Sequence, residues 1–301
     1  MFDSISIIGC GLIGSSILRA IKSKNLAKEI KIFDHSKEVN AYLKKENICT
    51  IVSNDIRQCV AQSDLVIIAT PLSSYKEIIL SIKSSLKRNV ILTDTGSVKK
   101  EVMKIIHNIN LTDVNWIPSH PIAGTEESGP KAGQADMFKN RWCIISPPQN
   151  CAEQPVEILK VFWEKIGSKV KIMTPEEHDE ILSLTSHLPH AIAYNIVRTV
   201  MSVEDKLKQE VIQYSAGGLR DFTRIAASNP LMWRDIFLDN SENITKGIDS
   251  FIEKLNELKK AVNDKNGDKL FQIFNSTKEV RKEIIKAGQD TSKPDFGRKK
   301  D

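Results

Sequence analysis

The stretch Gly9-Cys10-Gly11-Leu12-Ile13-Gly14 decides the fold of the first half of the chain. A GxGxxG motif is informative only where it follows a strand and opens a helix. Here the alternating apolar run Ser4–Ile8 precedes the motif, and a helical pattern over Ser15–Ser23 follows it. This order is typical of the first strand, turn and helix of a dinucleotide-binding βαβ unit.

Each glycine of this turn has a separate task. Gly9 permits the tight turn, Gly11 lets the backbone approach a pyrophosphate, and Gly14 lets the helix pack closely on the strand. The start of the helix offers free N–H groups and a partial positive charge to phosphate oxygens, so Leu12 and Ile13 are also expected at the cofactor. A glycine-rich turn without a ligand is the alternative interpretation.

The second predicted strand ends in an acidic residue, Asp34, about 20 residues after the last glycine of the motif. A carboxylate there accepts hydrogen bonds from the adenine-ribose hydroxyls and repels a 2′-phosphate, so Asp34 predicts NAD rather than NADP as the cofactor. Thr70 and Pro71 follow another strand and are expected beside the phosphates and ribose of the cofactor. Asp94, at the end of a further strand, completes the predicted cofactor-binding set.

Short β-rich runs alternate with helical patterns as far as Met173, which predicts a parallel sheet covered by helices in a Rossmann-type α/β domain. Thr174 then starts a helix, with Pro at the first position and Glu three residues after the cap. From there, helical spacing continues to about Lys286. The expected strands are Ser4–Ile8, Ile30–Phe33, Leu65–Ala69, Val90–Asp94, Trp116–Ser119, Trp142–Ser146 and Lys169–Met173.

These patterns divide the chain into three parts. We predict an NAD-binding domain over residues 1–173, an all-helical domain over residues 174–288 and a polar tail over residues 289–301.

Composition narrows the classes of function. The chain has 301 residues, 41% of them hydrophobic, and a formal net charge of +5, which is too small for a typical nucleic-acid binder. No apolar run approaches the roughly 18 residues of a membrane span, and no signal peptide is expected. The five cysteines are widely spaced without a CxxC pair, so we expect neither a disulfide framework nor a metal site. Small-molecule or protein partners and a reducing, cytoplasmic location are expected.

Two loops after predicted strands are expected at the carboxyl edge of the sheet, where ligands bind in open α/β folds. One loop contains Ser97 and the other contains His120. A histidine at a strand end, fixed by the following proline and near a serine, is suited to be a general base beside the nicotinamide. The alternatives are a histidine that caps local backbone and a serine that caps the following helix.

A polar stripe follows one face of the first helix of the helical domain. Asp179, Ser183, Ser186 and His190 fall within about 40° of one another at the helical period of about 100° per residue. We interpret the stripe as a binding surface, and a solvent-facing stripe is the alternative. Pro189 interrupts the same helix and is expected to kink it.

Two arginines further along the chain, Arg220 and Arg224, are one helical turn apart, a spacing suited to binding a carboxylate. A surface ion pair is the alternative interpretation for each.

With these motifs the chain resembles the prephenate dehydrogenase family, also called arogenate or cyclohexadienyl dehydrogenases, the oxidative enzymes of tyrosine biosynthesis. The resemblance extends over nearly the whole chain. It implies NAD-dependent oxidative decarboxylation of prephenate to 4-hydroxyphenylpyruvate and of arogenate to tyrosine, by a homodimer formed through the helical domain. It rests on the motifs GCGLIGSS, DTGSVK, SHPIAGTEESGP, SHLPHAIAYNIV, RDFTRIAASNPLMWRDIF and AGQDTSKPDFGR.

The same resemblance implies roles for individual residues. His120 receives the proton of the substrate's ring hydroxyl, and Ser97 forms a hydrogen bond at the same place. Glu127 departs from the family, because many relatives carry Lys or His there, which makes the pocket rim more acidic. The substrate-binding residues implied are His187 and His190 along the substrate, Ser186, Arg224 at a carboxylate, Thr125 in the pocket lining, Glu126, Asp179 and Trp233 as a polar gate, and Asp221 facing the neighbouring subunit.

Two other interpretations remain open at this point. A β-hydroxyacid dehydrogenase also has a Rossmann domain followed by helices, but it uses a lysine on the first long helix of its second domain. No lysine lies between Glu176 and Arg198. A non-catalytic dinucleotide sensor would keep the glycine turn and Asp34 but would have no use for His120.

Overall fold

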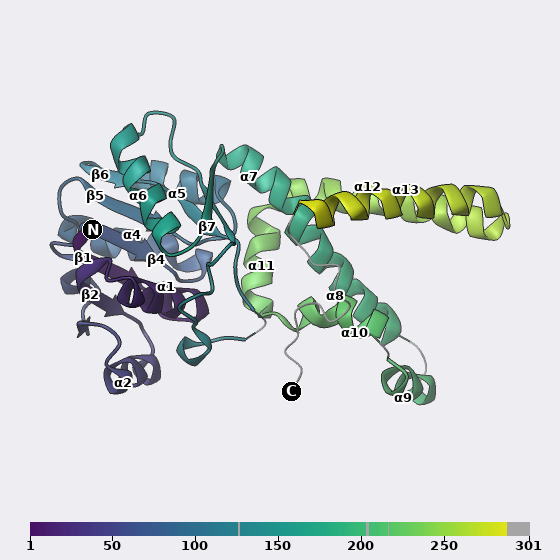
Figure 1. Cartoon of the computed structure of the whole chain (residues 1–301), viewed down its shortest axis with the longest axis horizontal. Coiled ribbons are helices and arrows are strands. Elements are labelled where there is room, and N and C mark those ends of the chain that lie inside the picture. Colours follow the sequence, from purple (N-terminus) through teal and green to yellow (C-terminus); the bar gives the residue numbers. More distant parts are fainter. Residues whose placement is uncertain (126, 203–204, 216, 288–301) are drawn as a thin grey trace. The chain divides into compact units, whose positions relative to one another are not determined.

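The computed structural model describes residues 1–125, 127–202, 205–215 and 217–287 of the chain. Two compact units, Met1–Thr245 and Lys246–Asp301, make up the chain (Figure 1). The boundary predicted after residue 173 falls within the first unit and stays a prediction. Among the described residues, no helix is long and apolar enough to cross a membrane.

Six parallel strands form the main sheet, in the order β3-β2-β1-β4-β5-β6. The central strand β1 pairs with β2 and β4, which places Ile7 beside both Ile32 and Ile67. This topology confirms the predicted Rossmann-type fold. The strands are β1 (Phe2–Ile8), β2 (Ala27–Phe33), β3 (Ile51–Val52), β4 (Leu65–Ile68), β5 (Val90–Asp94) and β6 (Val114–Trp116).

A second, three-stranded sheet contains β7 (Ser119–Pro121), β8 (Trp142–Ile145) and β9 (Lys169–Ile172). Strand β7 runs antiparallel to β8, whereas β9 runs parallel to it. The prediction of one strand over Trp116–Ser119 is therefore wrong. The physical reason is Pro118, which has no N–H for a strand ladder and separates β6 from β7.

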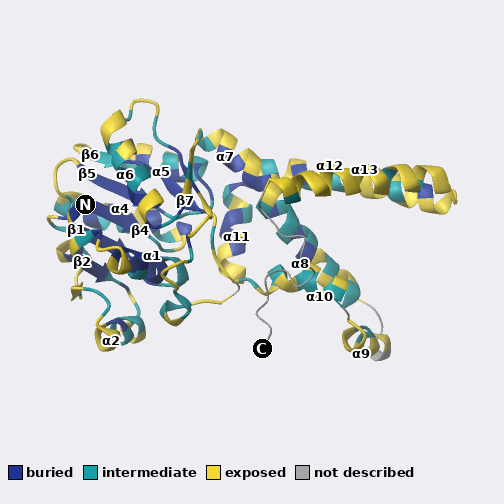
Figure 2. Cartoon of the chain, in the orientation of Figure 1, coloured by how far each residue is buried: buried dark blue, intermediate teal, exposed yellow. Residues whose placement is uncertain are grey.

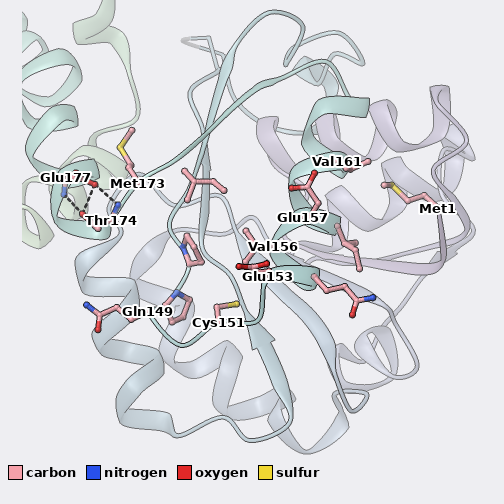
Figure 3. Close-up of a pocket in the computed structure, with 15 residues that line it drawn as sticks. Met1, Gln149, Cys151, Glu153, Val156, Glu157, Val161, Met173, Thr174 and Glu177 are labelled. Carbon is pink, nitrogen blue, oxygen red and sulfur yellow. Dashed lines mark hydrogen bonds between the residues drawn. The ribbon is translucent and has the colours of Figure 1, made fainter.

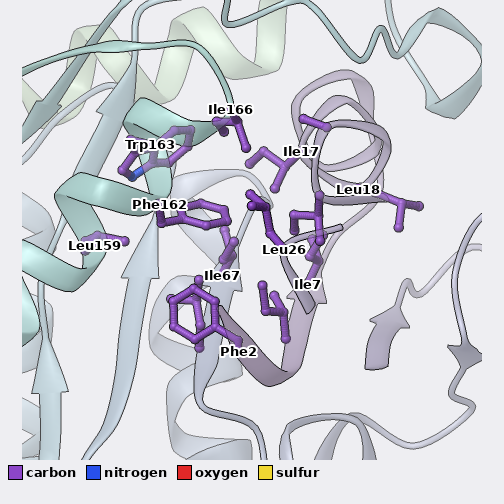
Figure 4. Packing of buried hydrophobic residues seen from close by; sticks show 14 of the residues in the cluster. Phe2, Ile7, Ile17, Leu18, Leu26, Ile67, Leu159, Phe162, Trp163 and Ile166 are labelled. Atoms are coloured by element: carbon purple, nitrogen blue, oxygen red, sulfur yellow. The ribbon is translucent and has the colours of Figure 1, made fainter. Parts of the chain in front are cut away.

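Alternating side chains of the main sheet supply two cores on its opposite faces. On one face, Ile7 and Ile67 pack with α1 (Leu12–Ser23) and α6 (Glu153–Lys165), which contributes Phe162 (Figure 4). Each large apolar side chain buried in this way contributes roughly 1.5–3 kcal/mol relative to exposure. The core thus fixes α1, and with it the glycine turn, against the strands.

The other face of the sheet is covered by α4 (Tyr75–Ile82) and α5 (Lys100–Ile109), whose apolar side chains form the second core with β4 and β5. In Figure 2 the strands are mostly buried, whereas the outer sides of the covering helices are exposed. The carboxyl ends of β1, β4 and β5 are held between these two layers, so the loops that follow them have rigid supports.

The helix predicted to start at Thr174 has the expected cap. The Thr174 hydroxyl accepts a hydrogen bond from the Glu177 amide, and the Glu177 carboxylate accepts one from the Thr174 amide, which confirms the capping box. This helix, α7 (Pro175–Leu182), continues into a π-helical turn over Ser183–His187 and then α8 (Leu188–Val200). The π-turn ends two residues before Pro189 and contains Thr185, whose carbonyl oxygen loses its α-helical donor because the proline has no N–H.

The predicted tail over residues 289–301 lies outside the described residues. The remaining helices complete both units. Helix α12 passes through the division between the two units. The bounds are α2 (Lys37–Glu46), α3 (Ile56–Val60), α9 (Asp205–Gln213), α10 (Gly217–Thr223), α11 (Pro230–Asp239), α12 (Ser241–Asn263) and α13 (Gly267–Lys286), with 3₁₀ turns at Leu72–Ser74, Lys83–Ser85, Pro130–Ala132 and Arg224–Ala227.

Candidate active site

The glycine turn between β1 and α1 has the shape that a dinucleotide requires. Gly9 has φ +88°, and a Cβ there would lie 2.6 Å from Thr70 Cγ2. A Cβ on Gly14 would collide with the Gly9 carbonyl oxygen, whereas Gly11 faces open space. Because Gly11 is the N-cap and has no side chain to cap α1, the first amides of the helix are available to phosphate oxygens.

Asp34 holds this turn from the end of β2. Its Oδ2 accepts a hydrogen bond from the Cys10 amide at 2.7 Å, and its Oδ1 accepts one from the Ser36 amide at 2.9 Å. The carboxylate is therefore fixed directly beside the glycine turn, as expected for a ribose-binding residue. Thr70 lies against Gly9 and borders the same turn, and Pro71 follows it in the chain.

Asp94 does not fit its predicted role at the cofactor. The carboxylate is fully buried, and its Oδ2 accepts hydrogen bonds from Lys99 Nζ at 2.6 Å and from the Gly96 amide at 2.8 Å. Oδ1 lies 3.2 Å from the Ser119 amide. We correct that prediction: Asp94 is a structural group that joins β5 to β7 through a buried ion pair with Lys99, whose Nζ also donates to the Ser119 carbonyl.

Ser97 does not cap the following helix, so the alternative interpretation for this residue is wrong. Helix α5 begins at Lys100, its N-cap is Lys99, and no side chain within the helix caps it. Instead Asp179 of α7 accepts hydrogen bonds from the Lys99 and Lys100 amides at 2.8 and 2.9 Å. A carboxylate at this position also complements the positive end of the helix dipole.

His120 lies on β7 in a chain of three hydrogen-bonded side chains. Its Nδ1 is 2.8 Å from His178 Nε2, and His178 Nδ1 is 2.7 Å from Asp179 Oδ1. Because the Asp179 carboxylate can only accept, His178 donates from Nδ1 and accepts at Nε2, and His120 donates from Nδ1. This order leaves His120 Nε2 with a lone pair that can take a proton. His120 does not cap local backbone through Nδ1, contrary to the alternative interpretation.

Burial and nearby positive charge keep His120 neutral. Desolvation lowers the pKa of His120 well below 6.5, and His178, Lys99 and His187 lower it further. Desolvation also lowers the pKa of His178, although the hydrogen bond to Asp179 opposes this shift. A neutral imidazole is the form that can act as a proton acceptor.

A second group of rings lies on α8 and α11. The ring of His190 stacks on Trp233 with centroids 3.6 Å apart, and the centroids of His187 and Trp233 are 6.0 Å apart. His190 Nδ1 is 2.9 Å from the Ser186 carbonyl oxygen, which leaves Nε2 of His190 for a ligand. Burial lowers the pKa of His190, and the nearby Arg224 guanidinium lowers it further, so Arg224 lies close to this group.

The first half of the polar stripe faces the interior of the protein. Asp179 and Ser183 are buried, so a solvent-facing stripe is the wrong interpretation for these two residues. The same burial corrects the predicted gate role of Asp179, because both of its oxygens accept hydrogen bonds inside the protein. Of the other predicted gate residues, Trp233 is 6% exposed, and Glu126 lies outside the described residues.

The remaining predicted residues lie on less buried segments. Thr125 is exposed, and its Oγ1 accepts a hydrogen bond from the Glu127 amide at 3.2 Å. Arg220 and Arg224 do not share one α-helix, because α10 ends at Thr223 and a 3₁₀ turn begins at Arg224. Asp221 is half-buried and lies 3.4 Å from Arg220 Nε.

Three polar residues of this site were missed from the sequence. His178 comes directly before Asp179 in the sequence. It was missed because the helical period places it on a different face from the polar stripe. Lys99 belongs to the DTGSVK motif, yet lysine is rarely fully buried, so nothing indicated its ion pair. Asn240 lies at the end of α11 and contacts both Asp179 and His187, which only the folded chain brings together.

A separate pocket of about 1070 Å³ opens beside α6 and β9 (Figure 3). Its lining includes Val156, Val161 and Met173, with Glu153 and Glu157 nearby, and none of the predicted site residues lines it. Among the described residues, no group of three or more His, Cys, Asp or Glu side chains could hold a metal ion.

Two family models together match most of the chain. The prephenate dehydrogenase nucleotide-binding domain matches residues 17–172, and the prephenate dehydrogenase dimerization domain matches residues 174–276. The chain belongs to the prephenate dehydrogenase family. This result confirms the resemblance found in the sequence motifs and excludes the β-hydroxyacid dehydrogenase interpretation.

Individual prephenate dehydrogenases agree with this assignment. Cyclohexadienyl dehydrogenase of Zymomonas mobilis is 38% identical over 281 residues, which are 93% of this chain and 96% of the relative. Prephenate dehydrogenase of Bacillus subtilis is 33% identical over 93% of this chain and 76% of the relative. The crystal structure of the A. aeolicus enzyme with hydroxyphenyl propionate and NAD+ has a TM-score of 0.87 at 30% identity, covering 94% of this chain and 99% of that chain.

Proposed function

We propose that the protein catalyses the NAD-dependent oxidative decarboxylation of prephenate to 4-hydroxyphenylpyruvate, and of arogenate to tyrosine. The observation that carries this proposal is the 2.8 Å hydrogen bond from His120 Nδ1 to His178 Nε2. It fixes a neutral His120 with a proton-accepting Nε2 at the carboxyl side of the sheet. A non-catalytic dinucleotide sensor has no need of such a group.

The substrate chemistry requires one proton acceptor and no metal. Prephenate is a cyclohexadiene with a hydroxyl on one ring carbon and a carboxylate on the opposite carbon. His120 Nε2 takes the proton of the ring hydroxyl, and Ser97 forms a hydrogen bond to the hydroxyl oxygen. The carbon that carries this hydroxyl becomes a ketone. The ketone is conjugated through the ring to the carboxylate-bearing carbon, so the electron pair of the breaking carbon–carbon bond moves to the ketone oxygen as carbon dioxide leaves. The ring becomes aromatic, and the resulting phenolate takes back a proton to give the phenol. Bound NAD supplies the hydride acceptor for this oxidation.

The cofactor fits the glycine turn through the chain's own groups. The amides at the start of α1 bind the pyrophosphate, and Gly11 gives it room to approach. The Asp34 carboxylate binds the ribose hydroxyls and disfavours a 2′-phosphate. Leu12 and Ile13 lie at the same helix start, and Thr70 borders the turn, with Pro71 next in the chain.

For the substrate we propose a site around the stacked rings of His190 and Trp233. Arg224, which lies close to His190, binds a carboxylate. Planar guanidinium groups match carboxylates with two parallel hydrogen bonds. The other residues proposed for this site are His187, Ser186, Thr125, Glu126 and Asp221.

We also propose that the protein is a homodimer formed through its helical part. The family model for residues 174–276 is described as a dimerization domain. Helices α12 and α13 are amphipathic, and several of their large apolar side chains are exposed in the single chain, which is typical of surfaces that associate. These side chains are Ile252, Leu255, Val262, Phe271, Phe274, Val280 and Ile284.

We also propose that the protein is located in the reducing cytoplasm, since all five cysteines are free.

Purified protein with NAD and prephenate tests the main proposal. The absorbance of NADH should rise only when both are present, and 4-hydroxyphenylpyruvate should accumulate in equal amount. The matched control is His120→Asn, which should bind NAD normally but form product at a strongly reduced rate. Absence of turnover with both prephenate and arogenate, in protein shown to bind NAD, contradicts the proposal.

A further inference from the structure

Asn240 is a buried amide between α7 and the π-turn that leads into α8. It is 4% exposed. Its Nδ2 lies 2.8 Å from the Asp179 carbonyl oxygen and 3.2 Å from His187 Nδ1, and its Oδ1 accepts a hydrogen bond from Asn243 Nδ2 at 2.9 Å. No sequence motif singled it out, and it does not belong to the chain from His120 to Asp179.

These neighbours fix the orientation of the amide. The Asp179 carbonyl oxygen can only accept, so it must face the NH₂ group of Asn240. The Asn243 NH₂ group donates to the opposite side, so it must face the oxygen. Rotating the amide by 180° would place two acceptors together on one side and two donors together on the other.

The orientation of Asn240 determines the tautomer of His187. Because Asn240 presents an N–H donor to His187 Nδ1, that nitrogen must be the acceptor, and the proton of the neutral ring is on Nε2. His187 is 1% exposed, and among the described residues its Nε2 has no hydrogen-bond partner. The indole Nε1 of the neighbouring Trp233 is likewise buried and unpartnered within the described residues.

A buried donor without a protein partner calls for an explanation, and a bound ligand that supplies the acceptor is one such explanation. Building on the proposed function, we propose that Asn240 is a positioning residue that fixes His187 as the Nε2–H tautomer, so that His187 donates a hydrogen bond to a carboxylate or keto oxygen of the substrate. Trp233 Nε1 is a second donor beside it. In the other tautomer, His187 would present a lone pair to the substrate oxygen and repel it.

Nitrogen NMR of the wild-type protein labelled with ¹⁵N-histidine tests the tautomer without any substrate. His187→Gln identifies the His187 signals, because they disappear from its spectrum. We expect the Nε2–H form between pH 6 and 8, since burial lowers the pKa of His187 to about 4. A protonated Nδ1, or an imidazolium at neutral pH, would overturn the proposal whether or not the protein turns over prephenate.

Asn240→Asp tests the consequence for the substrate. The carboxylate cannot donate, so it accepts from His187 Nδ1–H and leaves a bare Nε2 on the neutral ring. We expect the KM for prephenate at pH 8 to rise about 10- to 100-fold with a smaller change in kcat, as for loss of a hydrogen bond to a charged group. At acid pH the protonated His187 regains Nε2–H, so the KM should recover toward that of the wild type.

The charged and titratable groups facing His187 are Asp179 and His178 on α7 and His190 on α8, and all three are retained in this variant. Asn115→Asp is the matched control, because its Nδ2 also donates to a backbone carbonyl oxygen, that of Asn89 at 2.9 Å, and it contacts no group of this site. Its KM should stay within about twofold of wild type. An Asn240→Asp variant whose KM is unchanged, or is raised equally at every pH, would contradict the positioning role.

Discussion

His120 and His178 are joined by a 2.8 Å hydrogen bond between Nδ1 of the first ring and Nε2 of the second, although 58 residues separate them in sequence. Asp179 extends this pair and also accepts hydrogen bonds from the first amides of α5. One carboxylate therefore orients the proposed base and anchors α7 on α5. The proposed catalytic role of His120 and the local stability of α5 and α7 therefore depend on the same carboxylate.

Asp179→Asn should impair both properties. The amide can donate toward His178 Nδ1, which favours the wrong tautomer of His178 and then of His120, so we expect kcat to fall by about 10²–10⁴-fold. The weaker cap on α5 should cost about 1 kcal/mol of the free energy of unfolding. Steady-state kinetics and denaturant unfolding measure the two effects. Asp235→Asn is the control, because Asp235 is also buried but pairs with Arg234.

His120→Asn should lower kcat by about 10²–10⁴-fold with little change in the affinity for prephenate, because the variant lacks the proton acceptor. In the wild type, the lowered pKa of His120 leaves the ring neutral at pH 7. Log kcat should therefore be flat through neutral pH and fall only as pH drops well below 6.5. Near-normal kcat in the variant would assign His120 a structural role instead.

The glycine turn and its acidic partner could be predicted from the sequence because their signals are local. The spacing of Gly9, Gly11 and Gly14 and the position of Asp34 are properties of one βαβ unit. The capping box at Thr174 is equally local. The break at Pro118 was missed because the strand-forming residues Trp116 and Ile117 lead directly up to it.

The substrate end depends on contacts between segments far apart in the chain. Asp94 follows a strand as a ligand-binding residue would, but its role is decided by the buried ammonium of Lys99. Asp179 fits a polar stripe by its spacing, but the amides that it binds belong to α5. The effect of Asn240 on His187 could be inferred only from the three-dimensional positions of four polar groups. No spacing in the sequence indicates those positions.

Acidification should destabilise the protein partly through His187. Its pKa is about 4 in the folded protein and about 6.5 when unfolded, so between these values the unfolded state binds more protons. The stabilisation is therefore complete above pH 6.5 and is lost as pH falls toward 4, by on the order of 3 kcal/mol. Denaturant unfolding from pH 4 to 7 measures this slope. His187→Gln should flatten it, whereas replacing the exposed His107 with Gln should not.

Asp34→Ser should shrink the preference for NAD. Serine keeps a hydrogen-bonding group near the ribose but removes the negative charge that repels a 2′-phosphate. We expect kcat/KM with NAD to fall and kcat/KM with NADP to rise, measured with prephenate at saturation. Glu38→Ser, on the first turn of α2, is the control for a change of surface charge near the same end. A wild-type enzyme that prefers NADP would show that the ribose end is wrongly interpreted.

Substrate choice should not depend on the carboxylate site. Prephenate and arogenate share the ring and both carboxylates, and they differ in a keto group or an ammonium group on the side chain. Acidic residues such as Glu127 and Asp221 tolerate an ammonium and gain nothing from a ketone. We therefore expect measurable turnover of arogenate beside that of prephenate, compared at equal enzyme concentration.

Arg224→Ala should raise the KM for both substrates to the same extent. A charge-assisted hydrogen bond contributes on the order of 1.5–3 kcal/mol, which corresponds to a KM roughly 10- to 150-fold higher. Because the arginine binds a group that both substrates carry, the ratio of the two kcat/KM values should stay constant. Steady-state kinetics of the wild type and the variant on each substrate measure this ratio, with Arg220→Ala as the neighbouring control. A large effect on one substrate alone, or on neither, would remove Arg224 from the shared carboxylate site.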